Sequence, residues 1–143
     1  MTDAGYLPDV NVWVALASDR HEHHAVARAW FDSTAEPIYF CRVTQMAFLR
    51  LLTNARVMGD EALATPEAIE AYWRFFEDDR IGLLPEPIGI EDEWFALMDR
   101  RVRGSSWTDG YLGAVAIRAG LRLVSFDTGF RKWRAVPLHC LTA

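Results

Sequence analysis

Short apolar runs alternate with stretches of helical periodicity along the chain. Five short runs predict strands, and the stretches between them place apolar residues three or four positions apart, as amphipathic helices do. The expected strands are residues 5–8, 37–41, 81–84, 122–126 and 136–140. Strands that alternate with helices in this order predict an α/β fold, with a mostly parallel central sheet of four to five strands flanked by helices.

Start and stop signals place the helices between these strands. Thr65 precedes a proline and a glutamate, an order that suits the first turn of a helix. Thr108 is the expected N-cap of a later helix, and Gly120 suits the left-handed residue after its end. The expected helices are residues 10–17, 22–33, 44–53, 65–79, 90–102 and 108–119, with Thr44 as a cap of the third.

Length and composition fit one globular domain over residues 1–143. The chain is 51% hydrophobic with six Trp, which is too apolar for a disordered segment. No apolar stretch approaches the roughly 18 residues that cross a bilayer, so we expect a cytoplasmic protein without a membrane partner. Cys41 and Cys140 lack a paired C-x-x-C spacing, which favours buried thiols over a disulfide.

The charge of the chain limits how it can bind an anionic substrate. The net charge of -5 argues against a broad basic face of the kind that grips nucleic acid. An anionic substrate is therefore expected to be held at a local site.

Three aspartates mark the candidate site. Asp9 and Asp127 each follow an expected strand, and Asp109 begins the helix that leads into the Asp127 strand. Ligands of open α/β sheets bind beyond the carboxyl ends of the strands, so we expect the three carboxylates to converge there. Their repulsion would raise their pKa values unless a cation lay between them. Oxygen ligands of this kind suit Mg²⁺ or Mn²⁺.

Each aspartate also has a purely structural explanation. Asp9 can cap the helix that follows it, Asp109 can interact favourably with the dipole of its helix from the first turn, and Asp127 can open a turn. Each explanation is sufficient for one residue alone. The three together favour a metal site for hydrolysis of a phosphodiester.

Four segments resemble PIN-domain ribonucleases, in particular the VapC-type toxins of bacterial toxin–antitoxin pairs. They are LPDVNVWVAL, CRVTQMAFLRLLTN, SSWTDGYLGAVAIRAG and LVSFDTGF, and the resemblance covers essentially the full length. It implies a three-layer PIN-like fold and an endoribonuclease that hydrolyses RNA with Mg²⁺ or Mn²⁺. It also implies a homodimer restrained by a cognate VapB-type antitoxin.

The resemblance also implies roles for individual residues. Asp9, Asp109 and Asp127 correspond to the catalytic acids that hold the metal. Asn11 and Thr108 match positions that support these acids, as hydrogen-bonding neighbours of metal ligands do.

One position departs from the family pattern. PIN domains usually carry a further acid, often Glu, at the start of the helix after the second strand, where this chain has Gln45 or Ala47 beside Thr44. A Gln carbonyl accepts a hydrogen bond but adds no negative charge, so Thr44 and Gln45 are expected only to support the site. A second hypothesis is therefore a PIN-like scaffold that binds RNA or antitoxin without turnover.

A third hypothesis is a phosphatase of the haloacid dehalogenase type. The spacing of Asp9 and Asn11 resembles the D-x-D motif of those enzymes. They need an acid at position 11 and a suitably placed Lys, however, and Lys132 is the only Lys in the chain.

Basic residues near the acids are candidates for RNA contact. Arg50 either contacts a phosphate or pairs with one of the acids. Arg131 and Lys132 follow Asp127 closely, and Trp133 beside them is a candidate for stacking on a base, although a solvated loop is the simpler explanation.

Two other groups of side chains have structural explanations. The run His21 to His24, which includes Glu22, contains zinc-ligand types but matches no strong metal motif, so we expect an exposed helix start. Aromatic and apolar stripes predict core packing, with a part available to a dimer seam or an antitoxin groove. These stripes comprise Trp73, Phe76, Trp94, Leu97 and Met98.

Overall fold

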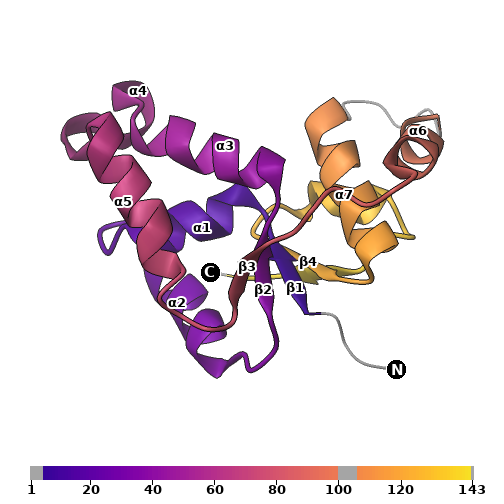
Figure 1. Ribbon diagram of the computed structural model, residues 1–143, viewed down its shortest axis with the longest axis horizontal. Helices are drawn as coiled ribbons and strands as arrows, with labels where there is room; N and C mark the ends of the chain where they lie inside the picture. Colours follow the sequence, from indigo (N-terminus) through magenta and orange to yellow (C-terminus); the bar gives the residue numbers. More distant parts are fainter. Residues whose placement is uncertain (1–4, 100–105, 143) are drawn as a thin grey trace.

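A five-stranded sheet divides the molecule into two groups of helices (Figure 1). The computed structural model describes residues 5–99 and 106–142. Within these residues the strands are β1 (Tyr6–Pro8), β2 (Ile38–Phe40), β3 (Ile81–Leu83), β4 (Arg122–Ser125) and β5 (Leu138–Cys140). Their order is β3-β2-β1-β4-β5, and every neighbouring pair is parallel. The predicted α/β fold with a parallel sheet is confirmed, and each strand is slightly shorter than expected.

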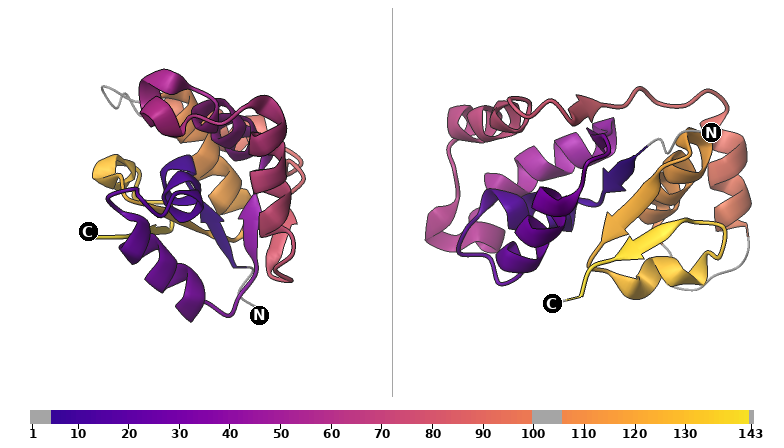
Figure 2. Two further views of the ribbon diagram at one scale, coloured as in Figure 1. Left: turned by 90° about the vertical axis from the view of Figure 1, so that its left-hand side faces the viewer. Right: turned by 90° about the horizontal axis from the view of Figure 1, so that it is seen from below.

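Helices cover both faces of the sheet, as the additional views in Figure 2 show. On one side lie α1 (Val10–Ala17), α2 (His24–Ser33), α3 (Arg42–Leu52) and α5 (Thr65–Phe75). On the other lie α6 (Ile90–Met98) and α7 (Trp107–Ala119). The buried side chains accordingly form two apolar clusters, one beneath each group of helices.

The first cluster is rich in aromatic rings. Trp13 of α1 stacks on Phe40 of β2 with ring centroids 3.7 Å apart, and Phe75 of α5 meets Trp13 edge-on at 5.0 Å. Trp13 and Phe40 are both fully buried. These rings anchor α1, which directly follows Asp9, and the end of β2, which directly precedes Cys41.

The expected helix starts are wrong by one to three residues at four places. One of these is α2, which begins at His24 instead of residue 22, and the other three concern the expected caps. Thr44 is the third residue of α3 rather than its cap, and its Oγ1 accepts a hydrogen bond from Cys41 N over 3.0 Å. The N-cap of α7 is Ser106, whose Oγ accepts from the backbone N of Asp109, instead of Thr108. Ala64 occupies the N-cap position of α5 in place of Thr65.

The helix ends follow the sequence signals unevenly. Gly120 ends α7 with φ 69°, as predicted, because glycine adopts the left-handed region without steric cost. By contrast, α5 ends at Phe75, before residue 79, and the expected end of the helix over 90–102 lies outside the described residues. Three short helical segments were not expected: α4 (Ala55–Met58), η1 (Gly59–Glu61) and η2 (Thr128–Lys132).

Most side chains expected in the core pack there, and Phe76, Trp94 and Met98 lie partly buried against the two clusters. Leu97 is buried, but Trp73 is 59% exposed on α5 and contradicts the expectation of core packing, because its stripe lies at the rim of the aromatic cluster. Cys41 and Cys140 are free thiols, the first buried and the second half-buried. Over residues 5–99 and 106–142, no helix has the length and apolar character that a bilayer crossing requires.

Candidate functional site

The carboxyl edge of the sheet brings Asp9 beside the end of β4. Pro8 of β1 pairs with Val124 of β4, so the next residues, Asp9 and Ser125, stand level on neighbouring strands. The backbone N of Asp9 donates to Val124 O over 2.7 Å, which continues the sheet by one more hydrogen bond. The sequence thus places a carboxylate and a hydroxyl next to each other at the expected ligand edge.

Both carboxylate oxygens of Asp9 are fixed by hydrogen bonds. Oδ1 accepts from the backbone N of Val10 over 2.8 Å, so Asp9 is the N-cap of α1. Oδ2 accepts from Ser125 Oγ over 3.0 Å. The capping explanation for Asp9 and the functional one are therefore compatible, because the cap holds the carboxylate in a defined orientation.

Ser125 connects three residues of the site. Besides donating to Asp9, its Oγ accepts from Asn11 Nδ2 over 3.2 Å and from the backbone N of Asp127 over 2.9 Å. Its side chain is completely buried. Sequence reasoning missed Ser125. The available signal was a hydroxyl residue at the end of the apolar run LRLVSFD, where burial requires a polar partner.

Asn11 supports the same edge from α1. Its Nδ2 donates to Ser125, and its Oδ1 accepts from the backbone N of Phe126 over 3.5 Å. These two contacts tie the first turn of α1 to the segment that carries Asp127. These bonds reach Asp9 and Asp127 only through Ser125 and the backbone, and the role of Asn11 in supporting the acids stays a prediction.

Asp127 begins a short helical turn directly after β4. Its Oδ1 accepts from the backbone N of Gly129 over 2.8 Å, so it is the N-cap of η2. The turn predicted for this residue is present. The hydrogen bond from Gly129 also fixes the orientation of the Asp127 carboxylate. The charge of this carboxylate contributes to the raised pKa values of both Asp9 and Asp109.

Asp109 reaches the site from the first turn of α7. It is half-buried, and burial is the main cause that raises its pKa. The charge of Asp127 raises this pKa further, whereas the charge of Lys132 lowers it. Asp109, Asp127 and Lys132 therefore lie within electrostatic reach of one another.

Asp9 has the most strongly perturbed carboxyl of the three. Burial raises its pKa to about 6, against the hydrogen bonds from Ser125 and Val10, which lower it. The charges of Asp109 and Asp127 add smaller increases. The charges of three aspartates from three separate segments thus act on one another. Such perturbed groups are typical of functional sites.

The donor chemistry of these acids fits a hard divalent cation. Within the described residues, no group of three or more His, Cys, Asp or Glu side chains could hold a metal ion as the side chains stand. A complete protein cage is not required, however, because Mg²⁺ keeps several waters and usually takes one or two carboxylates plus phosphate oxygens of the substrate. A cation would also relieve the repulsion that raises the pKa values of Asp9 and Asp109.

The side chain of Gln45 is committed to its neighbours. Its Nε2 donates to the hydroxyl of Tyr72 on α5 over 3.0 Å, and its Oε1 accepts from Arg42 Nη1 over 2.5 Å. Thr44 is buried and joins its hydroxyl to the backbone of Cys41. Thr108 is exposed in the first turn of α7 and donates its backbone N to Ser106. None of these three side chains is hydrogen-bonded to an aspartate of the site in the part of the chain that is described.

The basic candidates differ in their surroundings. Arg50 is exposed in the last turn of α3 and forms no ion pair with a described residue, so the proposed pairing with a site acid is not present. Arg131 is exposed on η2, and Lys132 Nζ lies 4.7 Å from the ring centroid of Trp133. Trp133 itself is buried and donates its indole N–H to Leu97 O, which contradicts a role in stacking on a base.

The histidine run forms a structural junction. His24 Nδ1 lies 2.8 Å from Ala15 O, and the ring of His23 stacks on Phe126 at 4.5 Å. His21 accepts a hydrogen bond from the backbone N of His23. These contacts attach the start of α2 to α1 and to the segment after β4, so the residues are less exposed than expected and their roles are structural.

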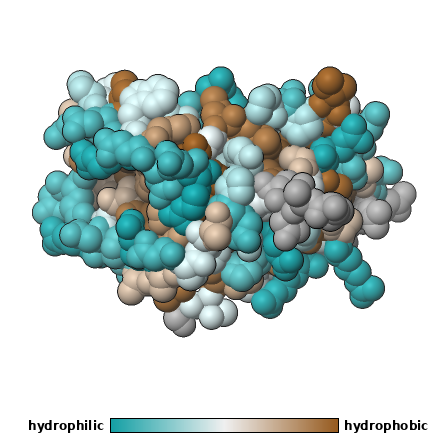
Figure 3. Space-filling model, turned by 60° about the horizontal axis from the view of Figure 1, so that its bottom comes forward, coloured by the Kyte–Doolittle hydropathy of each residue, from teal (hydrophilic) through white to brown (hydrophobic). Residues whose placement is uncertain are grey.

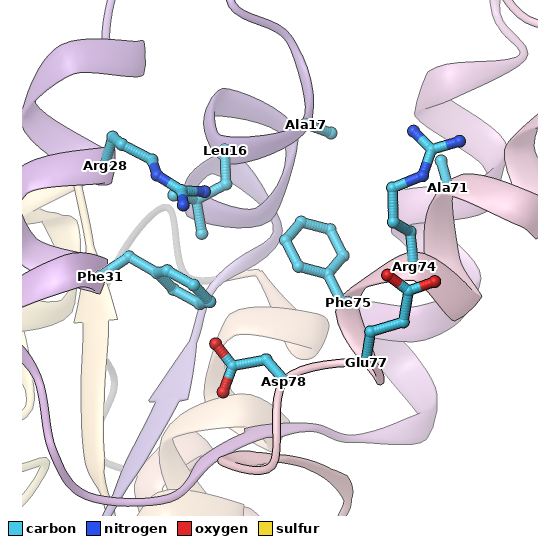
Figure 4. Close-up of a pocket in the computed structure, with 9 residues that line it drawn as sticks. All are labelled: Leu16, Ala17, Arg28, Phe31, Ala71, Arg74, Phe75, Glu77 and Asp78. Carbon is cyan, nitrogen blue, oxygen red and sulfur yellow. The ribbon is translucent and has the colours of Figure 1, made fainter.

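Among the described residues, two hollows of similar volume have walls to which none of the three aspartates contributes. The first, of about 490 Å³, lies between α1, α2 and α5 and is drawn in Figure 4. Phe31 and Phe75 form apolar walls, and Arg28 and Arg74 stand on opposite sides of it. Figure 3 shows hydrophilic residues gathered around a depression at this end of the molecule. The second hollow, of about 470 Å³, lies at the ends of β2 and β3.

The chain matches a family model described as PIN domain over residues 6–135. It is 43% identical over 142 residues to ribonuclease VapC41 of Mycobacterium tuberculosis, covering 94% of this chain and 97% of that protein. Ribonuclease VapC38 of the same organism is 34% identical over 86% of this chain and 85% of its own length.

Solved structures with the same fold include further proteins of this kind. Mycobacterium tuberculosis VapC20, a Sarcin-Ricin loop cleaving toxin, has a TM-score of 0.69 at 18% identity, over 89% of this chain and 93% of its own. A chain of DNA-bound VapBC from Salmonella typhimurium has a TM-score of 0.72 at 14% identity, over 95% of this chain and 97% of its own.

Proposed function

The chain belongs to the PIN domain family, and we propose that it is a metal-dependent endoribonuclease that acts as the toxin of a toxin–antitoxin pair. Relatives that match it over most of their length at 34–43% identity are named ribonucleases. The observation that carries the proposal is the orientation of Asp9 by Ser125 and Val10, beside the electrostatically coupled Asp109 and Asp127.

Asp9, Asp109 and Asp127 are the proposed ligands of a divalent cation, Mg²⁺ or Mn²⁺. A cation held there supplies Lewis acidity toward a phosphodiester and a water of lowered pKa. The chain itself orients the ligands: Ser125 and the N-terminus of α1 fix Asp9, and Gly129 N fixes Asp127. Ser106 accepts from the backbone N of both Thr108 and Asp109, and this shared cap is the proposed route by which Thr108 supports Asp109.

Basic residues of η2 and α3 are proposed to hold the RNA strand. Lys132 lies within electrostatic reach of Asp109, and Arg131 is exposed beside it. Arg50 is exposed and without an ion pair to a described residue, which leaves its guanidinium available for a phosphate. Local contacts of this kind suit a chain whose net charge is -5.

A VapB-type antitoxin is the proposed protein partner. Several solved structures with this fold are VapBC complexes. The hollow between α1, α2 and α5 offers apolar walls at Phe31 and Phe75, and its rim carries charges of both signs, which suits an amphipathic segment. Exposed Ile69 and Trp73, one turn apart on α5, are proposed to belong to a homodimer seam.

Cleavage of RNA by the purified protein tests the nuclease proposal. We expect cleavage with Mg²⁺ or Mn²⁺, silence with a chelator, and loss of cleavage in Asp109→Asn with the fold retained. Asp92→Asn is the matched control, because Asp92 is exposed in the first turn of α6, an equivalent helical position away from the site. Full cleavage by Asp109→Asn would remove the basis of the metal assignment.

The alternative, a scaffold without turnover, is favoured by one observation. The chain has Gln45 or Ala47 where the family usually has an acid, and the amide of Gln45 is bound to Arg42 and Tyr72. A scaffold would bind RNA or the antitoxin but would not cleave the RNA at any metal concentration. Metal-dependent cleavage by the wild-type protein, silenced by Asp109→Asn, excludes it.

A further inference from the structure

A hollow of about 470 Å³ opens on the same edge of the sheet as the acids, beyond β2 and β3. We call it the β2–β3 pocket. Its walls come from the residues after β2, the residues after β3 and one face of α7: Cys41, Arg42, Leu84, Pro85, Glu86 and Tyr111. The volume lies within the range of small-ligand sites.

The register of the sheet places this pocket close to Asp9. Tyr6 pairs with Ile38 and Phe40 with Leu83, so Asp9, Cys41 and Leu84 continue one row across β1, β2 and β3. At the usual strand spacing, Cys41 and Leu84 are about 5 and 10 Å from Asp9 along this row. Tyr111 lies two residues beyond Asp109 on α7. The pocket is thus within reach of a nucleotide beside a phosphate held at the acids.

The polar groups of the pocket are held in place. The hydroxyl of Tyr111 donates to Glu86 Oε1 over 2.6 Å, and among the described residues the other oxygen of Glu86 has no hydrogen-bond partner. Arg42 is held at the rim by its hydrogen bond to Gln45 Oε1. The pocket therefore presents a fixed carboxylate acceptor, an aromatic ring and a guanidinium.

We propose that the β2–β3 pocket binds the base of an unpaired guanosine next to the scissile phosphate, an inference that rests on the proposed nuclease function. Single-stranded RNA is read by stacking of splayed bases on aromatic rings and by hydrogen bonds to their Watson–Crick edges. Guanine presents the N1–H and N2–H donors side by side, and a carboxylate can accept from both. The Watson–Crick edges of adenine, cytosine and uracil combine a donor with acceptors, which a carboxylate cannot satisfy.

Glu86 thus determines the base, and Tyr111 orients Glu86 while its ring forms a wall against the base. Arg42 carries the opposite charge at the rim, where it pairs with a neighbouring phosphate. Gln45 holds Arg42 in that position. Gln45 consequently acts on RNA through Arg42.

Binding of short RNAs in a chelator, where no cleavage occurs, tests the pocket directly. The probes are fluorescein-labelled uridine heptamers with one central guanosine, inosine or adenosine, and the readout is fluorescence anisotropy at fixed salt. Inosine differs from guanosine only by the missing N2 amine. We expect wild-type protein to bind the guanosine heptamer at least about ten-fold more tightly than the other two.

Three variants distinguish the pocket from general RNA affinity. Glu86→Gln is expected to lose the guanosine preference while retaining its affinity for the adenosine heptamer, and Tyr111→Phe to lose part of the preference. Glu86 is exposed, so its replacement should leave the fold intact. Glu36→Gln is the matched control, because Glu36 precedes β2 at the opposite edge of the sheet. Equal wild-type affinities for the three probes, or a preference that survives Glu86→Gln, would overturn the proposal.

Cleavage of the same heptamers with Mg²⁺ or Mn²⁺ separates the pocket from the nuclease function. Cleavage without any guanosine preference in binding means that the nuclease stands and the pocket assignment is wrong. A guanosine preference that depends on Glu86, with no cleavage at any metal concentration, means that the pocket stands and the nuclease proposal fails.

Discussion

Ser125 Oγ donates a hydrogen bond to Asp9 Oδ2 over 3.0 Å and joins the ends of two neighbouring parallel strands. The same oxygen accepts from Asn11 and from the backbone N of Asp127. Because Ser125 is completely buried, no bulk water can take over these contacts. One hydroxyl therefore sets the positions of two of the three acids.

We expect Ser125→Ala to lower kcat/KM for RNA cleavage about 10- to 100-fold, the range for hydrogen-bonding neighbours of metal ligands. Ser125→Thr keeps the hydroxyl and should restore most of the activity. Titration of Mn²⁺ by electron paramagnetic resonance should show weaker binding to Ser125→Ala. Unchanged metal affinity and cleavage in a folded Ser125→Ala protein would show that the hydroxyl is not needed to orient Asp9.

Gln45→Ala tests what the amide does. Loss of the hydrogen bond to Tyr72 should destabilise the contact of α3 with α5 by about 1 kcal/mol, measured by urea unfolding. The metal dependence of cleavage should remain unchanged, because Gln45 is bound to Arg42 and Tyr72. A large rise in the Mg²⁺ concentration required for cleavage would instead place Gln45 among the groups that support the metal.

The strand pattern predicted the fold well, because short apolar runs between helical stretches have few parallel arrangements. The helix starts were predicted less well. Ser106 caps α7, although Thr108 is an equally suitable residue type because either hydroxyl can accept from a free backbone N–H. Only the path of the chain into the helix decides between the two residues. Trp73 was placed in the core because periodicity shows an apolar face but not what covers it.

The three candidate acids could be named from the sequence because each follows a strand or begins a helix, and their role as metal ligands stays a prediction. Ser125 could not be named in this way, since serine at a strand end is common and its value arises from three partners at distant positions in the chain. The same limit applies to Trp133, whose indole finds Leu97 O in α6 and is buried there. Long-range partners of single polar atoms are not visible in a sequence pattern.

Arg80→Ala should destabilise the protein by about 2 to 4 kcal/mol, measured by chemical unfolding. The Arg80 guanidinium donates to the backbone O of Phe31 and Thr34 at the end of α2, and to both oxygens of Asp78. These bonds attach the start of β3 to the end of α2. Removal of the side chain leaves Thr34 O without its donor, whereas Phe31 O keeps the hydrogen bond from Thr34 N. Arg134→Ala, at an exposed position, is the control and should change stability by less than about 0.5 kcal/mol.

The pKa of Asp78 offers a separate check on this contact. Hydrogen bonds from Arg80 lower that pKa to about 2 from the ordinary 3.8. A carboxyl whose pKa is lowered in the folded state stabilises the protein at pH values above its ordinary pKa. This stabilisation is lost as the pH falls through about 2. The stability difference between wild type and Asp78→Asn should therefore shrink between pH 4 and pH 2. A constant difference over that range would contradict the assignment.

Asp9 is expected to show the opposite pH dependence in metal-free protein. Burial is the main cause that raises its pKa to about 6 from 3.8, so the folded state binds a proton more tightly than the unfolded chain. Its protonated form therefore favours folding, and this contribution is lost as the pH rises from about 4 through 6. Above about pH 6, the ionised Asp9 carboxylate lowers the free energy of unfolding by on the order of 2 kcal/mol, after a reduction for its partial exposure to solvent.

Asp9→Asn should consequently raise the metal-free unfolding free energy at pH 8 by a similar amount and change it little at pH 4. Urea unfolding at both pH values, in a chelator, measures the effect, with Asp92→Asn as the control for removing one exposed carboxylate. Added Mn²⁺ should stabilise wild type at pH 8 more than Asp9→Asn, because a cation favours the ionised carboxylate. If Asp9→Asn is less stable than wild type at pH 8 without metal, Asp9 acts primarily as a helix cap, and its ionised carboxylate does not destabilise the metal-free fold.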